Sequence, residues 1–163
     1  MKNKLFIIFI FVLFNSLFFK AHGIEAFNFD VTEIQISENG NKFVGIKRGV
    51  IRSNDGVIIK ADQFEYEKKL NILNANGNVE ITDKINKYLI NADSITYKKQ
   101  EEIIYTRGNS KAFSMRDNII IYSKDFNYNR KKNIITAEKE VIIENKDEDY
   151  KINSDFISYL LNE

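Results

Sequence analysis

A six-residue pattern recurs four times in this chain at a constant spacing of 31 residues. Each copy starts at a small residue, places an apolar residue three positions later and ends near a tyrosine. The copies are Ala61-Asp62-Gln63-Phe64-Glu65-Tyr66, Ala92-Asp93-Ser94-Ile95-Thr96-Tyr97, Ser123-Lys124-Asp125-Phe126-Asn127-Tyr128 and Ser154-Asp155-Phe156-Ile157-Ser158-Tyr159. A fixed period between 20 and 50 residues is typical of stacked supersecondary units. We therefore predict a stack of about five repeats, the first irregular and the last incomplete.

Within each repeat, apolar and polar residues alternate. Val57, Ile59 and Ala61 share one parity, and a longer set runs from Leu73 to Ile81. Alternation rich in β-branched and aromatic residues is typical of half-buried strands. The dipeptides Asn39-Gly40 and Asp55-Gly56 are hairpin turn signals. The fold class is therefore predicted to be all-β, an antiparallel β-jellyroll of stacked 31-residue hairpins with almost no helix after residue 24.

The alternation changes phase once in each repeat, at the small residue that opens the six-residue pattern. A phase change repeated four times predicts that the strand bends there and passes from one sheet to a second, facing sheet. An ordinary β-bulge within one sheet is the alternative. Gly77 and Gly108 lie where the returning strand needs a matching bend. The predicted bends are at Ala61, Ala92, Ser123 and Ser154.

The first 23 residues are predicted to be a secretory signal peptide. Lys2 and Lys4 form a basic start, and the apolar run from Leu5 to Phe19 is short for a membrane span. Ala21-His22-Gly23 offers small residues at a cleavage site before Ile24. An uncleaved membrane anchor is the alternative. Residues 24–163 are then a single exported domain.

The composition excludes several classes of function. His22 is the only histidine and cysteine is absent, so residues 24–163 can carry neither Ser-His-Asp or Cys-His catalysis nor a His- or Cys-ligated metal. Asp62, Asp93 and Asp155 recur at the repeat spacing, and we interpret them as caps of backbone donors at the bends. Residues 24–163 carry 21 basic and 23 acidic side chains, which argues against a nucleic-acid partner. We expect no enzyme, no cofactor and no metal.

The remaining candidates are the apolar residues that share the inner parity, a parity on which we expect no charged residue. They form either the closed core of a sandwich or the lining of an apolar groove for acyl chains, and the pattern alone does not decide between the two. The predicted groove lining is Ile59, Phe64, Tyr66, Leu73, Val79, Ile90, Ile95, Tyr97, Ile104, Ile121, Phe126 and Tyr128.

Three segments resemble the OstA-like repeat of the periplasmic lipopolysaccharide carriers LptA and LptC and of the N-terminal domain of LptD. They are residues 61–66, 75–81 and 90–95, and the resemblance extends from about Phe29 to the C-terminus. It implies a β-jellyroll open along one edge, a periplasmic location and an apolar interior along which the acyl chains of lipid A slide. It also implies joining to other Lpt proteins by pairing of edge strands. Lipopolysaccharide and those Lpt proteins are the expected partners.

The resemblance leaves the member of the family open. Residues 27–34 and 47–51 are more similar to the N-terminal domain of LptD, which would associate the protein with the outer membrane, whereas the length is that of an LptA-like bridge. A closed all-β module that binds periplasmic proteins through its edges is the alternative function. The expected edge-strand contacts are Ile152, Phe156, Ile157 and Tyr159.

Overall fold

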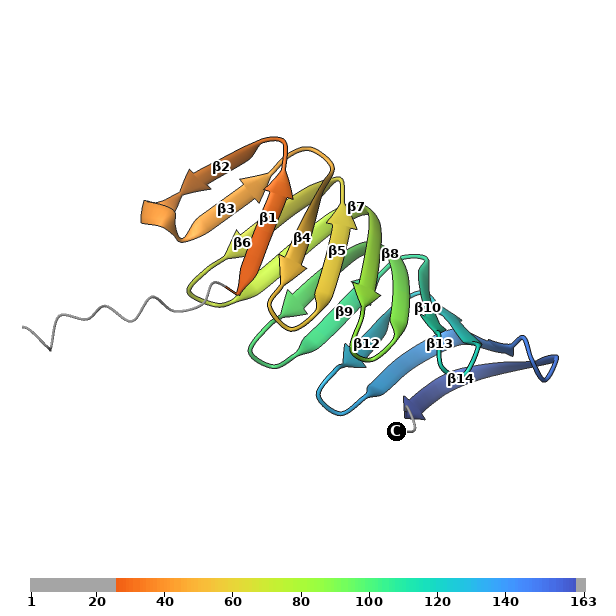
Figure 1. The fold of residues 1–163 in the computed structure, drawn as a ribbon. Helices are drawn as coiled ribbons and strands as arrows, with labels where there is room; N and C mark the ends of the chain where they lie inside the picture. The colour runs from red at the N-terminus through yellow and green to blue at the C-terminus, as the bar shows by residue number, and fades with distance from the viewer. Residues whose placement is uncertain (1–25, 161–163) are drawn as a thin grey trace, which may run out of the picture.

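The computed structural model describes residues 26–160 and is built almost wholly of antiparallel strands (Figure 1). One short 3-10 helix, η1, covers Glu38–Gly40. The strands are β1 (Phe27–Val31), β2 (Ile34–Ser37), β3 (Lys42–Gly45), β4 (Gly49–Ser53), β5 (Val57–Ala61), β6 (Gln63–Glu67), β7 (Ile72–Asp83), β8 (Tyr88–Lys98), β9 (Ile103–Arg107), β10 (Ser110–Ser114), β11 (Ile119–Ser123), β12 (Phe126–Asn129), β13 (Ile134–Asn145) and β14 (Tyr150–Leu160).

The strands form two facing halves of one hydrogen-bonded sheet. Half-sheet A contains β1, β4, β5, β10 and β11, together with the ends of β7, β8, β13 and β14 that pair with them. Half-sheet B contains β2, β3, β6, β9 and β12 and the other ends of the same long strands. Because β7, β8, β13 and β14 cross without a break, the two predicted sheets are continuous with each other. This confirms the predicted fold class.

The corner between the halves is made by pairs of left-handed residues. Gly77 and Asn78 have φ of 78° and 47°, and Gly108 and Asn109 have φ of 74° and 47°. At the first pair the register between β7 and β8 shifts between Asn76 and Val79. The buried residues of β8 change parity at the same level, which is the phase change read from the sequence. The bend is therefore a true corner rather than a bulge within one flat sheet.

Aspartates hold two of these corners together. The Asp62 carboxylate accepts a hydrogen bond from the Asn78 side chain at 2.7 Å, and the Asp62 N–H donates to the Gly77 carbonyl at 3.0 Å. Asp93 makes the same two bonds to Asn109 and Gly108, at 2.8 and 2.9 Å. The two aspartates thus have a structural role, but their carboxylates accept hydrogen bonds from side-chain amides instead of capping backbone donors as predicted.

The third corner departs from this pattern. Lys139 and Glu140 take the places of the glycine and the asparagine and still adopt φ of 65° and 53°. Residues other than glycine and asparagine rarely adopt this conformation, which costs roughly 1–2 kcal/mol per residue. The register between β13 and β14 shifts there too, between Glu138 and Val141. The stack therefore imposes the corner geometry even where the local sequence opposes it.

The core lies between the two half-sheets and contains residues from both. Phe27 of half-sheet A contacts Tyr66 of half-sheet B with ring centroids 5.0 Å apart, and Tyr88 contacts Tyr128 across the same interior at 5.2 Å. The expectation that the inner parity carries no charge is wrong at Asp83, which ends β7 on the inner side and is fully buried. Buried partners, described below, make this position tolerable.

The predicted signal peptide and its cleavage site lie outside the described residues. Within residues 26–160, the structure contains no helix long and apolar enough to cross a membrane. The first strand that the structure describes, β1, begins at Phe27, and the predicted domain start at residue 24 also lies outside the described residues.

Replacing Gly77 with alanine tests the corner. A Cβ there would lie 2.7 Å from an oxygen of Asp62, on a residue with positive φ. Gly40 has a similar φ of 84° but open space around it, so it is a matched control for the backbone effect alone. We expect Gly40→Ala to lower the free energy of unfolding by about 1–2 kcal/mol and Gly77→Ala by at least about 1 kcal/mol more, measured by urea denaturation. Equal losses in the two variants would contradict the corner model.

Candidate functional site

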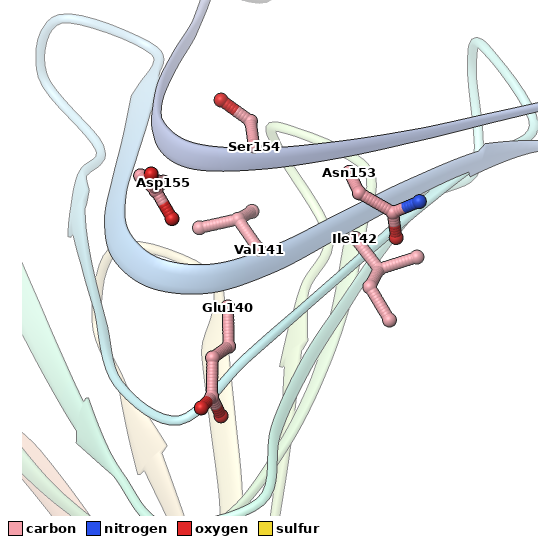
Figure 2. A pocket seen from close by; sticks show the side chains of 6 residues that line it. All are labelled: Glu140, Val141, Ile142, Asn153, Ser154 and Asp155. Carbon is pink, nitrogen blue, oxygen red and sulfur yellow. The ribbon is translucent and has the colours of Figure 1, made fainter.

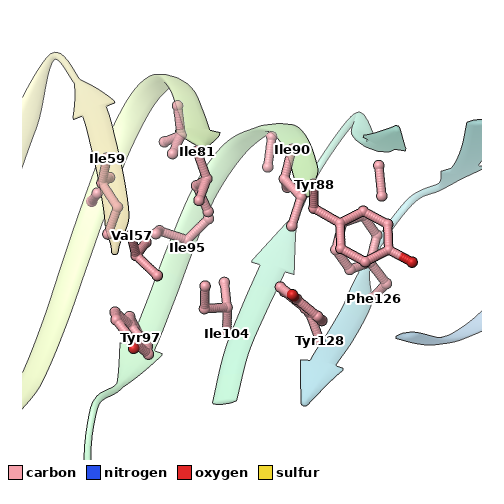
Figure 3. Packing of buried hydrophobic residues seen from close by; sticks show 14 of the residues in the cluster. Val57, Ile59, Ile81, Tyr88, Ile90, Ile95, Tyr97, Ile104, Phe126 and Tyr128 are labelled. Carbon is pink, nitrogen blue, oxygen red and sulfur yellow. The ribbon is translucent and has the colours of Figure 1, made fainter. Parts of the chain in front are cut away.

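The predicted groove residues all lie between the half-sheets. Each is at most 5% exposed, and together they belong to one apolar cluster that follows the stack (Figure 3). Figure 3 shows Ile59, Ile95, Ile104 and Phe126 pointing into the same layer from different strands. The members are Ile59, Phe64, Tyr66, Leu73, Val79, Ile90, Ile95, Tyr97, Ile104, Ile121, Phe126 and Tyr128. In this structure their side chains fill the interior, so an acyl chain has to part the half-sheets to reach them.

The apolar lining becomes solvent-exposed at the last hairpin. Ile152 of β14 corresponds by the 31-residue spacing to the buried Ile90 and Ile121, yet it is 48% exposed. Its cross-strand partner Ile143 is half-buried, whereas the corresponding Ile81 is buried. The interior is therefore accessible to solvent at the β13–β14 end of the stack.

The hairpin turns form two rows along the side opposite the corners, and we call this side the turn margin. Half-sheet A contributes the turns after β4, β7, β10 and β13, and half-sheet B those after β6, β8 and β12. Neighbouring turns of one row are linked by backbone hydrogen bonds. For example, the N–H of Lys99 donates to the Asn71 carbonyl at 3.0 Å, and the N–H of Arg130 donates to the Glu102 carbonyl at 3.0 Å.

Tyrosines at the repeat spacing bind across the turn margin. The Tyr97 hydroxyl donates to Asp55 at 2.6 Å, and the Tyr128 hydroxyl donates to Asp83 at 2.9 Å. Tyr159 of β14 makes the equivalent bond to Asp117 at 2.7 Å. The three tyrosines come from half-sheet B and their acceptors from half-sheet A. Side chains thus close the margin at three levels of the stack.

Arg130 is the centre of this closure. It follows β12 in half-sheet B and is 4% exposed. Its Nε donates to Asp83 at 2.7 Å, and its Nη1 donates to Asp55 at 2.5 Å and to the Tyr97 hydroxyl at 3.0 Å. We call Asp55, Asp83, Tyr97, Tyr128 and Arg130 the clasp. Lys99 extends it, with its Nζ 2.5 Å from Asp55.

Contacts within the clasp keep its aspartates ionised although burial opposes their charge. Burial alone raises the pKa of Asp83, but the hydrogen bond and charge of Arg130, backbone donation from Asn86 and the Tyr128 hydroxyl together lower it. For Asp55 burial again opposes ionisation, and hydrogen bonds from Lys99 and Tyr97 with the charge of Arg130 hold the pKa well below its usual range. Burial and the neighbouring aspartates raise the pKa of Tyr97 and Tyr128, so both hydroxyls remain protonated donors.

Sequence reasoning missed the clasp, although the sequence contains signals of it. Tyr97 and Tyr128 are predicted from the sequence as apolar lining and Tyr159 as an edge-strand contact, and their hydroxyls are given no role. Basic residues recur at the same spacing, as Lys68, Lys99 and Arg130, and turn residues with polar side chains recur as Asp55, Asn86 and Asp117. The pairing of these rows was not predictable, because the spacing does not tell which level of half-sheet A faces which level of half-sheet B.

The predicted edge residues lie on β14, which pairs only with β13 among the described strands. Phe156 is 55% exposed, and Ile152 is also exposed. Ile157 is buried and Tyr159 is half-buried, so these two belong to the interior of the last hairpin. At the opposite end, within residues 26–160, β1 pairs only with β4, and β2 pairs only with β3.

Surface hollows show no comparable site. One of about 340 Å³ at the third corner is lined by Glu140, Val141, Ile142, Asn153, Ser154 and Asp155, and the carboxylates of Glu140 and Asp155 lie apart from each other (Figure 2). In the part of the chain that the structure describes, no three His, Cys, Asp or Glu side chains are grouped to hold a metal ion. The interior and the turn margin are therefore the candidate site.

Acid titration of Asp83→Asn tests the electrostatics of the clasp. The folded-state pKa of Asp83 lies below its unfolded value near 3.9, so its contribution is complete above about pH 4 and is lost as the pH falls further. We expect Asp83→Asn to lower the free energy of unfolding by about 3–5 kcal/mol at pH 7, because Arg130 stays buried with fewer partners. The loss should shrink below about pH 4, because the unfolded parent chain then takes up a proton at Asp83 and the parent loses this stabilisation as well.

Asp30→Asn is the matched control for this titration. Asp30 pairs with Arg52 at 3.4 Å on the surface, with its side chain 72% exposed. Such a pair is worth about 0–1 kcal/mol, so this variant should follow the parent at every pH. A flat difference between Asp83→Asn and the parent from pH 7 to pH 3, measured by thermal denaturation, would exclude an ionised Asp83 in the clasp.

Comparison with known proteins supports the fold. No family model matches the sequence, and no curated protein sequence matches it. Among solved structures, the chain is similar to LptH from Pseudomonas aeruginosa, described as the LptA-homologous periplasmic component of the lipopolysaccharide transport device. The TM-score is 0.62 at 8% sequence identity, over 83% of this chain and 95% of that one. The chain therefore has the LptA-like β-jellyroll fold.

Proposed function

We propose that this protein is a periplasmic component of lipopolysaccharide transport that binds the acyl chains of lipid A between its half-sheets. The observation that carries the proposal is the apolar lining, which runs along the stack without a break from strand to strand. Burying one methylene group of an acyl chain contributes about 0.8 kcal/mol, which offsets part of the cost of parting the packed side chains of the lining. The LptA-like fold and the OstA-like repeat pattern support the same function.

The accessible end of the interior supports binding rather than a purely structural role. A closed structural module has no need to expose inner-parity residues, yet Ile152 is exposed and Ile143 is half-buried at the β13–β14 end. The alternative, a closed all-β module that binds proteins through its edges, is favoured by the full burial of the lining elsewhere. Direct capture of lipid at the lining distinguishes the two.

Edge pairing is the proposed route of assembly. Strand β14 exposes Phe156 on its outer face and leaves one backbone edge unpaired among the described strands. Unpaired edges accept a strand from another chain. We infer that another Lpt protein pairs here and continues the apolar lining. The similarity of residues 27–34 and 47–51 to LptD favours an LptD-like, outer-membrane-associated member over an LptA-like bridge.

Photo-crosslinking in cells tests the lipid site. We expect a photoreactive amino acid at Phe64 or Phe126 to capture lipopolysaccharide, because both side chains lie in the interior. The matched controls are Glu65 and Asn127, the next residues on the same strands, which point to the opposite face. Immunoblotting for lipopolysaccharide adducts measures the result. Equal capture from both faces would leave the closed module as the function.

A lysine at Phe156 tests the edge. Phe156 and Leu70 are equally exposed, at 55%, but Leu70 lies in a turn of half-sheet B, away from β14. We expect Phe156→Lys to weaken the pairing of a second chain with β14 by roughly 1–3 kcal/mol, in the range of an interface hot spot. We expect Leu70→Lys to leave this association unchanged. Analytical ultracentrifugation over a concentration series measures this. Identical association in the parent and in Phe156→Lys would contradict pairing at this edge.

A further inference from the structure

The clasp is an ionic group at the margin of an interior that is mostly apolar. Its residues come from two neighbouring turns of half-sheet A, at the end of β4 and the end of β7, and from the end of β8 and of β12 in half-sheet B. Arg130 and Asp55 are 75 residues apart in sequence and meet across the turn margin. The clasp therefore joins the half-sheets at the middle of the stack, between the N-terminal lining around Phe64 and the exposed end at β14.

Because the clasp is polar, the half-sheets can separate there at a lower cost than at an apolar contact. A buried ion pair is rarely more stabilising than an apolar contact of the same size, because both charges lose their hydration. The same hydration is regained when the half-sheets separate, whereas an apolar seam gains nothing from water. A clasp made of Arg130, Asp55 and Asp83 consequently holds the margin closed while keeping the opened state accessible.

The contacts on the two sides of the clasp differ in kind. Towards β14 the margin is held by polar contacts that include the hydrogen bond from Tyr159 to Asp117, and Ile143 and Ile152 beside it are partly exposed. Towards β1 the interior is filled by the contacts of Tyr66 with Phe27, Phe29 and Phe43, and Phe27 also contacts the clasp residue Tyr97. A chain that enters at the β14 end reaches the clasp before it reaches this aromatic section.

We propose that the clasp is a gate that sets how fast an apolar chain passes from the β14 end of the interior to the section around Phe64. This proposal rests on the proposed function, since it requires apolar chains to enter at all. Because the gate opens reversibly, it controls the rate of passage rather than the final occupancy. It therefore agrees with lipid capture at Phe64 under continuous transport.

A single-tryptophan quenching experiment tests the gate, because the chain contains no tryptophan. Phe64→Trp places the reporter behind the clasp, on β6, and Ile157→Trp places it on β14, before the clasp. A brominated stearate, which quenches tryptophan on contact, is added by stopped flow to the purified protein. We expect rapid quenching of Trp at 157 and slow quenching of Trp at 64.

Arg130→Met removes the central cation of the clasp. We expect it to accelerate quenching at 64 by at least about tenfold, because the remaining carboxylates favour the hydrated, open margin, and to leave the rate at 157 unchanged. The double variant Asp83→Leu/Arg130→Met replaces ions with an apolar contact. It should quench at 64 more slowly than Arg130→Met, and no faster than the parent.

Arg48→Met is the matched control. Arg48 also bridges two carboxylates, Asp62 at 3.0 Å and Glu80 at 2.6 Å, but it does so at the corner side of the sheet. It should leave both quenching rates as in the parent, which separates gating from the loss of an arginine ion pair in general.

The outcomes separate the gate from the function. Equal rates at 64 in the parent and in Arg130→Met, or equal acceleration by Arg48→Met, would overturn the gate while quenching at 157 still supports the binding of apolar chains. Absence of quenching at both positions in every variant, at saturating stearate, would overturn the proposed function and the gate together.

Discussion

The corner geometry is the constraint on which the rest of the structure depends. Strands β7 and β13 bend through a pair of left-handed residues and keep one buried parity, while the paired strand β8 changes its buried parity at that bend. Without it the alternating residues of the two half-strands would lie on opposite faces of a flat sheet and could not share one interior. Gly77 and Gly108 adopt this conformation at little cost, while Lys139 and Glu140 adopt it only because the neighbouring strands of the stack fix the register.

The corner also explains why the turn margin carries the polar contacts. Folding the sheet at one side leaves the two rows of hairpin turns facing each other at the other side, where backbone pairing does not join them in the described strands. Side chains must then close the interior, and tyrosine suits this role since its ring packs with the core while its hydroxyl reaches an acceptor. Asp55, Asp83 and Asp117 supply those acceptors from the opposite row.

The strands, the corner and the edges could be predicted from the sequence, because each depends on a local pattern. The alternation of apolar and polar residues indicates the strands. The change in its phase at Ala92 indicates the corner, and the last apolar strand of the sequence indicates the edge. The clasp could not be predicted in this way. Asp83 continues the inner parity of β7 as an isolated charge, and its partner Arg130 lies 47 residues away on a different level. Only the relative offset of the half-sheets brings the two together.

The apolar lining and the clasp place opposite demands on the interior. Burial of the lining stabilises the closed state in proportion to the apolar area removed from water, and on its own it would make opening costly at every level. Ionic and hydroxyl groups at the margin change this balance locally, since their hydration offsets part of the cost when the half-sheets separate. A stack that is stable as a domain and, as we propose, admits a long apolar chain can satisfy both demands by placing its buried ions at the margin, as Arg130 and its partners do here.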